Sequence, residues 1–597
     1  MSESSLKKRI VAVLLFCTIA ALSVPSIAWA TIEEGDQSEP TDEEIAAATD
    51  AGWIETGSKD AAASEEDDSL PYVALGAQSD ISLGAQGSKV SSAPYTIKEY
   101  SGATMYETAV SQAEAAFMKS EYAIIAGPGD AWVDALSAAG LAGALKCPIL
   151  FSEKNSMHPA SMQSLKKMGV KKVLIVGGTA AVGAGAQKDL EDAGIEVKKR
   201  LGGKDCYGTQ MEIFNYGIEN NLWSGDLAII ATGTWFGDAL SVSPVAYKLK
   251  APIFLVSGTK DLNATQKDAW KKASEKGMFK KVEAVGGEAV VSKSAIAFGN
   301  EMIKKAGGTG EVAWEWGQTQ YETSSAIANY AVKHQGFDWD NVAFTTGKQP
   351  YDALAGSVYQ GSSNSVMLLA DSAKATTISE AYAQRSRIKT MRFFGGKRAL
   401  TSNTRIGIAD KFGIPYASIP NFKLYLDAGH GPNDLGNGYY SSGATGNGYE
   451  EYELTYELAH KVYDILHGEY GVDIFLNDDG GPYRYRHAEA VAQGCDMIVS
   501  IHFNATPGGS GSLTLVHSYN DAEMSWPLAE QVHPYLVSSM GLHDYGIRGQ
   551  QVAILGGQLP AILLEICFID NWYDMQIYQA NKSKVARNIA NCIIAKP

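Results

Sequence analysis

A pattern of short motifs that occurs three times between residues 95 and 418 constrains the fold more than any other feature of the chain. Each copy contains, in order, a tyrosine followed two positions later by a threonine, an apolar run, an Asp-Ala-Leu, a second apolar run and a Gly-Gly. The tyrosines are Tyr106, Tyr207 and Tyr321, and the aspartates are Asp134, Asp238 and Asp352. Because the order and the spacing are both kept, the segment is an internal triplication with a period of a little over 100 residues.

Each copy alternates short β-branched runs with helix-like stretches such as Ala135–Leu145 and Ser161–Met168. This alternation predicts a small α/β unit with a largely parallel sheet. We place the three units at residues 95–199, 200–313 and 314–418.

Two motifs of the repeats could carry chemistry, the Gly-Gly pair and the Asp-Ala-Leu. The Gly-Gly pair permits a tight turn, but neither GxGxxG nor GxxxxGK[ST] accompanies it, which argues against nucleotide binding. The aspartate of each Asp-Ala-Leu follows a loop and precedes a helix, so we expect it to be a helix N-cap. Three similar units without a catalytic constellation indicate a binding module.

The N-terminal segment has the three parts of a secretory signal. Lys7, Lys8 and Arg9 precede an apolar run from Ile10 to Val24, and Ala28-Trp-Ala30 supplies small residues for cleavage. The run is short for a membrane span, which needs roughly 20 apolar residues. We therefore expect residues 1–30 to be a signal peptide and the mature chain to be secreted without a membrane span.

Residues 31–94 form an acidic linker. Positions 31–70 hold fourteen Asp or Glu residues against one Lys, and large apolar residues are few. Such a segment cannot bury enough apolar surface to offset its ordering entropy, so we expect a disordered spacer.

Five cysteines follow the signal segment: Cys147, Cys206, Cys495, Cys567 and Cys592. Their number is odd, they lie far apart, and no CxxC occurs. We expect small buried apolar side chains and no disulfide or zinc-finger framework.

The motifs Tyr-Glu-Thr-Ala, Asp-Ala-Leu-Ser and Val-Gly-Gly resemble the cell wall binding type 2 repeat of Gram-positive surface proteins, which occurs as a triplet. The resemblance implies non-covalent attachment to an anionic cell wall polymer. A net charge of about +5 on residues 71–420 is compatible with such a partner. Basic residues gather in one stretch, where a solvated face and a polyanion contact both remain open: Arg385, Arg387, Lys389, Arg392, Lys397 and Arg398. Nucleic acid is not an expected partner, because no aromatic-basic interleaving occurs.

The pattern changes after residue 420, and residues 422–597 form a separate domain. One apolar run, Leu424–Leu426, leads through Asp427 to His430, a second run carries His502, and a third carries Glu565. In a parallel sheet the strand ends gather on one edge, where ligand sites form. A predicted helix with its apolar residues on one face begins near Glu450 and Glu451.

Two histidines, one glutamate and a separate carboxylate are the set that zinc-dependent hydrolysis of an amide requires. Neutral imidazole and carboxylate hold Zn²⁺ and leave a fourth position for water. The additional carboxylate takes and returns the proton. The sequence therefore predicts a zinc hydrolase site in this domain.

The order of these motifs, from Asp427-Ala-Gly-His-Gly to Ala561-Ile-Leu-Leu-Glu565, resembles the zinc-dependent N-acetylmuramoyl-L-alanine amidase family over residues 422–595. The resemblance implies an α/β domain with a twisted, mostly parallel sheet. It also implies that His430, Glu451 and His502 are the zinc ligands and that Glu565 is the catalytic glutamate, with Glu450 as the alternative to its neighbour. Arg486 also matches a family arginine, but the sequence gives it no role. Three features depart from the family pattern and leave the substrate contacts open: Pro432, the longer segment 437–445, and Tyr545-Gly-Ile-Arg548, which stands where the family often has an arginine-glycine pair.

Together the two resemblances imply a secreted, wall-associated peptidoglycan hydrolase of the autolysin type. It would cleave the amide between N-acetylmuramic acid and L-alanine while the repeats hold it on the wall. Two alternatives remain at this point. One is a wall-attached adhesin or surface-layer protein with an inactive amidase domain, and the other is a zinc peptidase that acts on cross-links.

Overall fold

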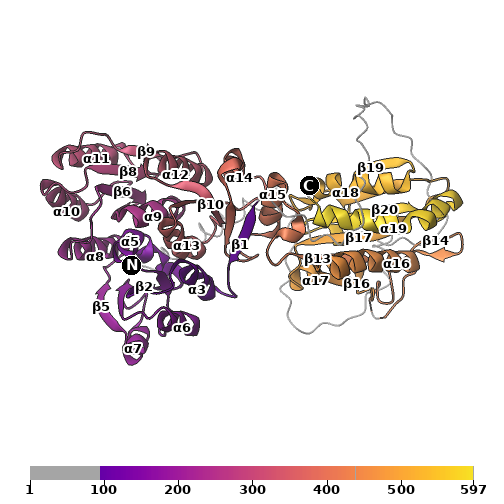
Figure 1. The fold of residues 1–597 in the computed structure, drawn as a ribbon, viewed down its shortest axis with the longest axis horizontal. Coiled ribbons are helices and arrows are strands. Elements are labelled where there is room, and N and C mark those ends of the chain that lie inside the picture. The colour runs from indigo at the N-terminus through magenta and orange to yellow at the C-terminus, as the bar shows by residue number, and fades with distance from the viewer. Residues whose placement is uncertain (1–94, 437, 596–597) are drawn as a thin grey trace, which may run out of the picture. The chain divides into compact units, whose positions relative to one another are not determined.

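The computed structural model describes residues 95–595 with the exception of Asn437. The expected signal peptide and acidic linker lie outside the described residues. Within the described part, no helix combines the length and apolar content that a membrane crossing needs. The described chain is α/β throughout, as predicted (Figure 1).

The repeats form three four-stranded sheets in which every strand pair is parallel. The strands are β1 (Thr96–Tyr100), β2 (Tyr122–Ala126), β3 (Ile149–Phe151), β4 (Lys172–Val176), β5 (Glu196–Leu201), β6 (Leu227–Thr232), β7 (Ile253–Val256), β8 (Lys281–Val285), β9 (Ala313–Glu315), β10 (Asp338–Thr345), β11 (Ser365–Leu369) and β12 (Thr390–Phe394). The helices are α3 (Met105–Ala116), α4 (Trp132–Ala135), α5 (Ala139–Leu145), α6 (Pro159–Lys167), α7 (Ala184–Asp192), α8 (Cys206–Glu219), α9 (Gly237–Leu249), α10 (Ala264–Glu275), α11 (Lys293–Lys305), α12 (Gln320–His334), α13 (Tyr351–Ser362), α14 (Thr376–Ala383) and α15 (Ser402–Phe412).

The edge strand of each of the first two sheets crosses the boundary to the following repeat. The first two sheets have the orders β3-β2-β4-β5 and β7-β6-β8-β9, and β5 and β9 lead directly into the opening helices α8 and α12. The third sheet has no following repeat and takes β1, which pairs with β12 from Thr96–Thr390 to Tyr100–Phe394. The three repeats are therefore closed into a ring by strand exchange.

Helices α5, α9 and α13, one from each repeat, pack against one another where the three units meet. Small residues make this approach possible. A Cβ added to Gly143 would lie 1.8 Å from the carbonyl oxygen of Tyr247, and one added to Gly140 would lie 2.0 Å from that of Ala251. Close packing of these backbones therefore depends on glycine in α5.

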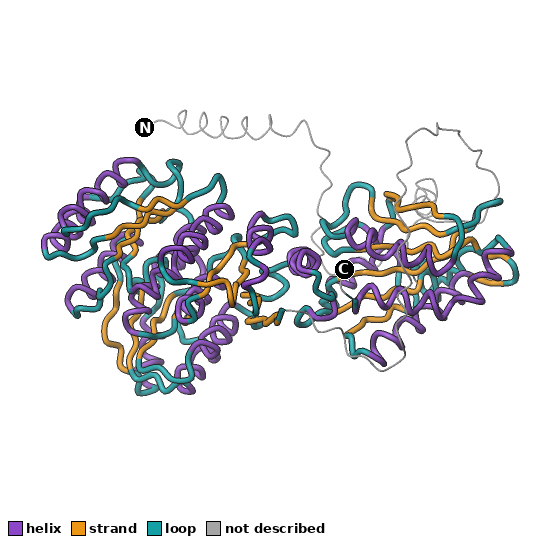
Figure 2. The backbone as a smooth tube through the Cα atoms, turned by 45° about the horizontal axis from the view of Figure 1, so that its top comes forward, coloured by secondary structure: helices purple, strands orange, loops and turns teal. Residues whose placement is uncertain are grey.

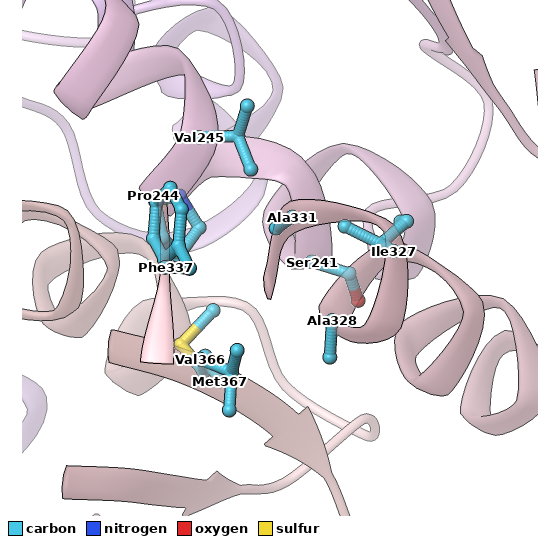
Figure 3. Close-up of a pocket in the computed structure, with 9 residues that line it drawn as sticks. All are labelled: Ser241, Pro244, Val245, Ile327, Ala328, Ala331, Phe337, Val366 and Met367. Atoms are coloured by element: carbon cyan, nitrogen blue, oxygen red, sulfur yellow. The ribbon is translucent and has the colours of Figure 1, made fainter. Parts of the chain in front are cut away.

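A small cavity lies between α9, α12 and β11 (Figure 3). Its walls are almost entirely apolar: Ser241, Pro244, Val245, Ile327, Ala328, Ala331, Phe337, Val366 and Met367. The Ser241 hydroxyl donates to the carbonyl of Gly237 at 2.8 Å, so this polar group is already satisfied. The cavity is a gap in helix packing and offers no polar groups to orient a ligand.

Two predictions for the repeats need correction. The Asp-Ala-Leu aspartates lie in the first turn of their helices and are not N-caps. The capping positions are Ala131, Phe236 and Pro350. The basic stretch is not one exposed face either, because Arg392 is buried and donates to Gln360 and Ser363. A strand places every second residue in the interior, so neighbours in the sequence need not share a surface.

The prediction that the cysteines are buried holds for four of the five, and Cys206 is half-buried. Each of the five described cysteines is free.

The third strand of each sheet has a different residue at its central position. Leu174, Glu283 and Arg392 pair with the middle strands at equivalent places. Glu283 is fully buried, accepts from Gln335 Nε2 at 2.5 Å and leaves its other oxygen without a hydrogen bond among the described residues. Burial raises the pKa of Glu283 to about 7.

We expect the second repeat to lose stability as the pH rises, because Glu283 binds its proton more tightly in the folded state. Its contribution is complete below the unfolded pKa of about 4.5 and is lost as the pH passes the folded value of about 7. The difference between these pKa values corresponds to about 3 kcal/mol. The free-energy advantage of Glu283→Gln over the wild type should therefore grow by about that amount from pH 5 to pH 8, as measured by chemical unfolding. Glu283→Leu, which copies Leu174, should show the same trend, and a pH-independent difference would contradict it.

The C-terminal domain contains a six-stranded sheet with the order β16-β13-β17-β20-β18-β19. All pairs are parallel except β18–β20. The strands of the domain are β13 (Lys423–Ala428), β14 (Thr445–Gly446), β15 (Tyr449–Glu450), β16 (Asp473–Asn477), β17 (Met497–Asn504), β18 (Ser512–His517), β19 (Asp544–Gln550) and β20 (Ala561–Phe568). Its helices are α16 (Glu451–Tyr463), α17 (Arg486–Ala492), α18 (Ser525–Met540), α19 (Trp572–Ile594) and the short 3-10 turn η6 (Ala553–Leu555).

The two faces of this sheet are covered unequally. Helices α16, α18 and α19 pack on one face and bury most of the apolar core (Figure 2). The other face carries a smaller cluster in which Tyr425, Ile498 and Leu563 meet residues of α17 and η6. The side chains of His502 and Glu565 follow this second face, because they stand two residues after Ser500 and Leu563 on the same strands.

Candidate metal centre

The structure brings His430, Glu451 and His502 together at the carboxyl ends of β13 and β17. One donor atom from each lies within 4.8 Å of the others. His430 Nε2 is 3.2 Å from Glu451 Oε2, and His502 Nδ1 is 2.9 Å from Glu451 Oε1. The three residues are far apart in the sequence and meet because the sheet aligns the strand ends.

Glu451 is the first residue of α16, and its carboxylate is only 1% exposed. The backbone amide of Phe503 donates to Oε1 at 2.9 Å, and that of Ala444 donates to Oε2 at 2.8 Å. Glu450 belongs to β15 and accepts from the hydroxyl of Tyr440 instead. Of the two candidate glutamates, Glu451 is the one that faces the histidines.

Two glycines leave room for this cluster. A Cβ on Gly443 would lie 2.4 Å from the His430 ring and 2.6 Å from Glu451 Oε2. A Cβ on Gly429 would lie 2.5 Å from the His502 ring. The segments around the donors are therefore built to approach them without side chains of their own.

His430 is oriented by groups on its other ring nitrogen. Its Nδ1 lies 3.0 Å from Ser441 Oγ and 3.3 Å from Asp434 Oδ2, which leaves Nε2 facing Glu451. Nε2 is buried and has no hydrogen bond of acceptable geometry among the described residues. Burial lowers the pKa of His430, but Glu451 and Asp434 outweigh burial and raise it to about 10. Burial raises the pKa of Glu451, and the two histidines more than reverse that effect and lower it.

Arg486, which the sequence left without a role, holds the turn at His430 through hydrogen bonds. Its guanidinium donates to Asp427 Oδ1 at 2.9 Å, to Asp434 Oδ1 at 2.8 Å and to the carbonyl of His430 at 2.9 Å. His430 has a φ of +67°, a conformation that a non-glycine residue keeps only when its surroundings hold it. Arg486 therefore fixes both the backbone of His430 and the carboxylate that orients its ring.

Asp427 anchors the same network to the sheet. Its buried carboxylate also accepts from Asn477 Nδ2 at 2.6 Å and from Ser500 Oγ at 2.5 Å. These contacts tie β13 to both neighbouring strands directly under His430. Asp434 and Ser441 are positioning residues that the sequence reasoning missed. The only available signal for Asp434 was its place four residues after His430.

Glu565 lies beside the three donors. It is paired with His502 across adjacent parallel strands and with Leu513 on its other side. Neighbouring strands are about 4.8 Å apart, and paired residues point to the same face of the sheet. The four predicted site residues are thus gathered at one edge of the sheet.

The donor set fits a zinc ion. Bonds of about 2.0–2.2 Å in a tetrahedral site put the donors about 3.4 Å apart, close to the separations around Glu451. Two imidazoles and one carboxylate supply three ligands and leave one position open. The second nitrogen of His430 is hydrogen-bonded, as is usual for a metal-bound histidine.

Comparisons with known proteins agree with this domain structure. Residues 424–595 match the family described as N-acetylmuramoyl-L-alanine amidase. Residues 99–187, 200–296 and 316–405 match cell wall binding domain 2. The chain carries three cell wall binding repeats and an N-acetylmuramoyl-L-alanine amidase domain. Both resemblances drawn from the sequence are confirmed.

The relatives include proteins with one or both parts. The chain is homologous to the N-acetylmuramoyl-L-alanine amidase LytC of Bacillus subtilis (strain 168), at 26% identity over 484 residues, 80% of this chain and 90% of that protein. The amidase domain is 33% identical over 156 residues to an endolysin of Bacillus phage SPP1, covering 25% of this chain and 55% of the endolysin. Among solved structures, Cwp6 from Clostridium difficile matches at 20% identity with a TM-score of 0.45, covering 84% of this chain and 78% of that one.

Proposed function

We propose that the amidase domain hydrolyses the amide that joins N-acetylmuramic acid to L-alanine, with a zinc ion held by His430, Glu451 and His502. The observation that carries the proposal is the convergence of these donors beside Glu565 within the segment that matches the amidase family. When bound there, Zn²⁺ supplies a Lewis acid that polarises the scissile carbonyl and makes water acidic enough to attack near neutral pH.

In this proposal Glu565 transfers the proton, and the other residues position the metal ligands. Glu565 takes the proton from the attacking water and returns it to the leaving amine, so that L-alanine departs with a neutral amino group. Asp434 and Ser441 hold the ring of His430, and Arg486 holds Asp434. Two backbone amides fix the carboxylate of Glu451, so both of its oxygens stay directed at the two histidines.

We further propose that the chain is secreted and that the repeats attach it to an anionic polymer of the cell wall. The three matches to cell wall binding domain 2 support wall attachment. The signal-like N-terminus supports secretion. Attachment at the substrate raises the local concentration of enzyme on the wall, in the same way that a tether does for two linked binding modules.

Digestion of purified cell wall tests the proposed reaction and separates it from its alternatives. Mass spectrometry should find stem peptides with new L-alanine N-termini, and removal of the metal with EDTA should stop their release until Zn²⁺ is restored. New termini within the cross-links would instead mean a peptidase. Absence of any cleavage by zinc-loaded protein would favour a wall-bound protein with an inactive domain.

A further inference from the structure

The sheet register places one arginine on the same face as the proposed catalytic residues. Arg548 of β19 pairs with Leu515 of β18, and Leu515 pairs with Leu563 of β20. Paired residues share a face, and Leu563 stands two residues before Glu565, so all of these side chains point the same way. Ile547, the residue before Arg548, points to the opposite face of the sheet and packs against the larger apolar core. The guanidinium of Arg548 is therefore presented on the face that holds His502 and Glu565.

Arg548 is pre-positioned by an aromatic platform. Its guanidinium lies over the Tyr545 ring at 5.5 Å from the centroid, and its Nε donates to the Tyr545 carbonyl at 3.2 Å. The Tyr545 ring in turn lies 5.7 Å from that of Phe568, at the carboxyl end of β20. These contacts continue from Arg548 to the strand end that carries Glu565, and they reduce the entropy lost when the guanidinium binds a ligand.

The charge of Arg548 is not paired with a carboxylate in the part of the chain that the structure describes. Residues 421–597 nevertheless carry a net charge of about −11. Arg587 on α19 shows the usual alternative, since it forms a two-pronged pair with Glu469 at 2.6 Å. An exposed arginine that lies over an aromatic ring and has no carboxylate partner among the described residues is suited to a planar anion that accepts two hydrogen bonds.

The distance from Glu565 fits a group on the peptide side of the substrate. Two strand spacings of about 4.8 Å and one two-residue step of about 6.8 Å put the Cα atoms of Arg548 and Glu565 about 12 Å apart. Two or three residues of extended peptide span about 7–10 Å. The first residue after the scissile amide is alanine, which carries no charge, so a carboxylate can first occur on the second or third residue.

We propose that Arg548 is a specificity-determining residue that binds a carboxylate on the second or third residue of the stem peptide. This inference rests on the proposed amidase function and adds the recognition of charge on the peptide. The contact is remote from the reacting atoms and is made equally in the ground state and the transition state. Its loss should therefore raise KM and leave kcat little changed.

The test uses three synthetic muramoyl tripeptides and the full chain loaded with zinc. One substrate carries free carboxylates at both positions, and the others have a carboxamide at the second or the third residue. We expect the wild type to cleave at least one carboxamide substrate about 10-fold less efficiently than the free acid, through KM. Arg548→Gln should bring the ratio of kcat/KM values close to 1. Arg548→Lys should keep part of the preference, because lysine retains the charge but not the two-pronged geometry.

Arg587→Gln, which removes a half-buried arginine of α19 that is paired with Glu469, is the control and should keep the wild-type preference. Equal cleavage of the three substrates by the wild type, or an unchanged preference in Arg548→Gln, would overturn the subsite while the amidase function stands. If the wild type cleaves none of them, the proposed function fails and the subsite fails with it. Thermal unfolding of each variant confirms that a change in KM is not a loss of folded protein.

Discussion

Glu565→Gln is expected to lower kcat for wall digestion by about 10²–10⁴-fold while the zinc content stays at the wild-type level. Glutamine has the same shape as glutamate, but it cannot accept a proton from water, and general-base catalysis contributes about this factor. Glu565 is paired with His502 across the sheet and is not one of the three clustered donors, so we expect the metal to stay bound when its charge is removed. The measurement is release of soluble stem peptides, with metal content determined on the same sample.

The control for this prediction is Glu530→Gln, which neutralises an exposed carboxylate on α18 and should leave activity within about 2-fold of the wild type. If Glu565→Gln keeps more than about one tenth of the activity, another group must move the proton. If it loses the zinc together with the activity, Glu565 holds the ion and the division of roles proposed above is wrong.

The sequence predicted the architecture well because the repeats and apolar runs carry local signals. Motifs kept in order three times indicate three units, and runs such as Ala123–Ala126 are buried in the middle of parallel sheets. Strand exchange was not predictable in this way. Pairing of β1 with β12 joins residues almost 300 positions apart, and no local pattern states which edge a strand will occupy.

The site residues that could be predicted from the sequence also differ in their local signals from those that could not. His430, His502 and Glu565 could be proposed because each follows or ends an apolar strand, and strand ends meet at one edge. Asp434 and Ser441 could not be proposed, because they come from irregular segments whose path depends on tertiary contacts. Asp434 is held beside His430 by Arg486, and Ser441 is held there by its pairing with Gly431.

Dependence on tertiary contacts also explains why the sequence could not decide which of Glu450 and Glu451 faces the histidines. Both stand at the beginning of a helix, and the family pattern alone favoured Glu451. In the structure the chain changes from strand to helix between them, so their side chains point in different directions. Glu451 is buried against both histidines, whereas Glu450 contacts the hydroxyl of Tyr440 near the surface.

Because only Glu451 faces the histidines, substitutions of Glu451 and Glu450 form a matched test of the metal site. Glu451→Gln is expected to weaken zinc binding by at least about 100-fold and to abolish activity, because it removes a charged ligand rather than an outer contact, whose loss alone costs about 10–100-fold. Glu450→Gln removes one charge from the adjacent position and should keep both zinc and activity. Competition with a chelator gives the affinity, and wall digestion gives the activity.

Folding is the remaining concern for Glu451→Gln, because Glu451 also accepts from the amides of Phe503 and Ala444. Glutamine can accept one of these bonds through its carbonyl oxygen but presents an NH₂ group to the other, which costs about 1–3 kcal/mol for a buried donor left without a partner. Glu451→Asp keeps the charge and shortens the side chain, so it separates the two effects. If it binds zinc better than Glu451→Gln at equal thermal stability, the charge of Glu451 holds the metal. If both variants bind zinc like the wild type, Glu451 is a structural residue and the metal centre must be built from other groups.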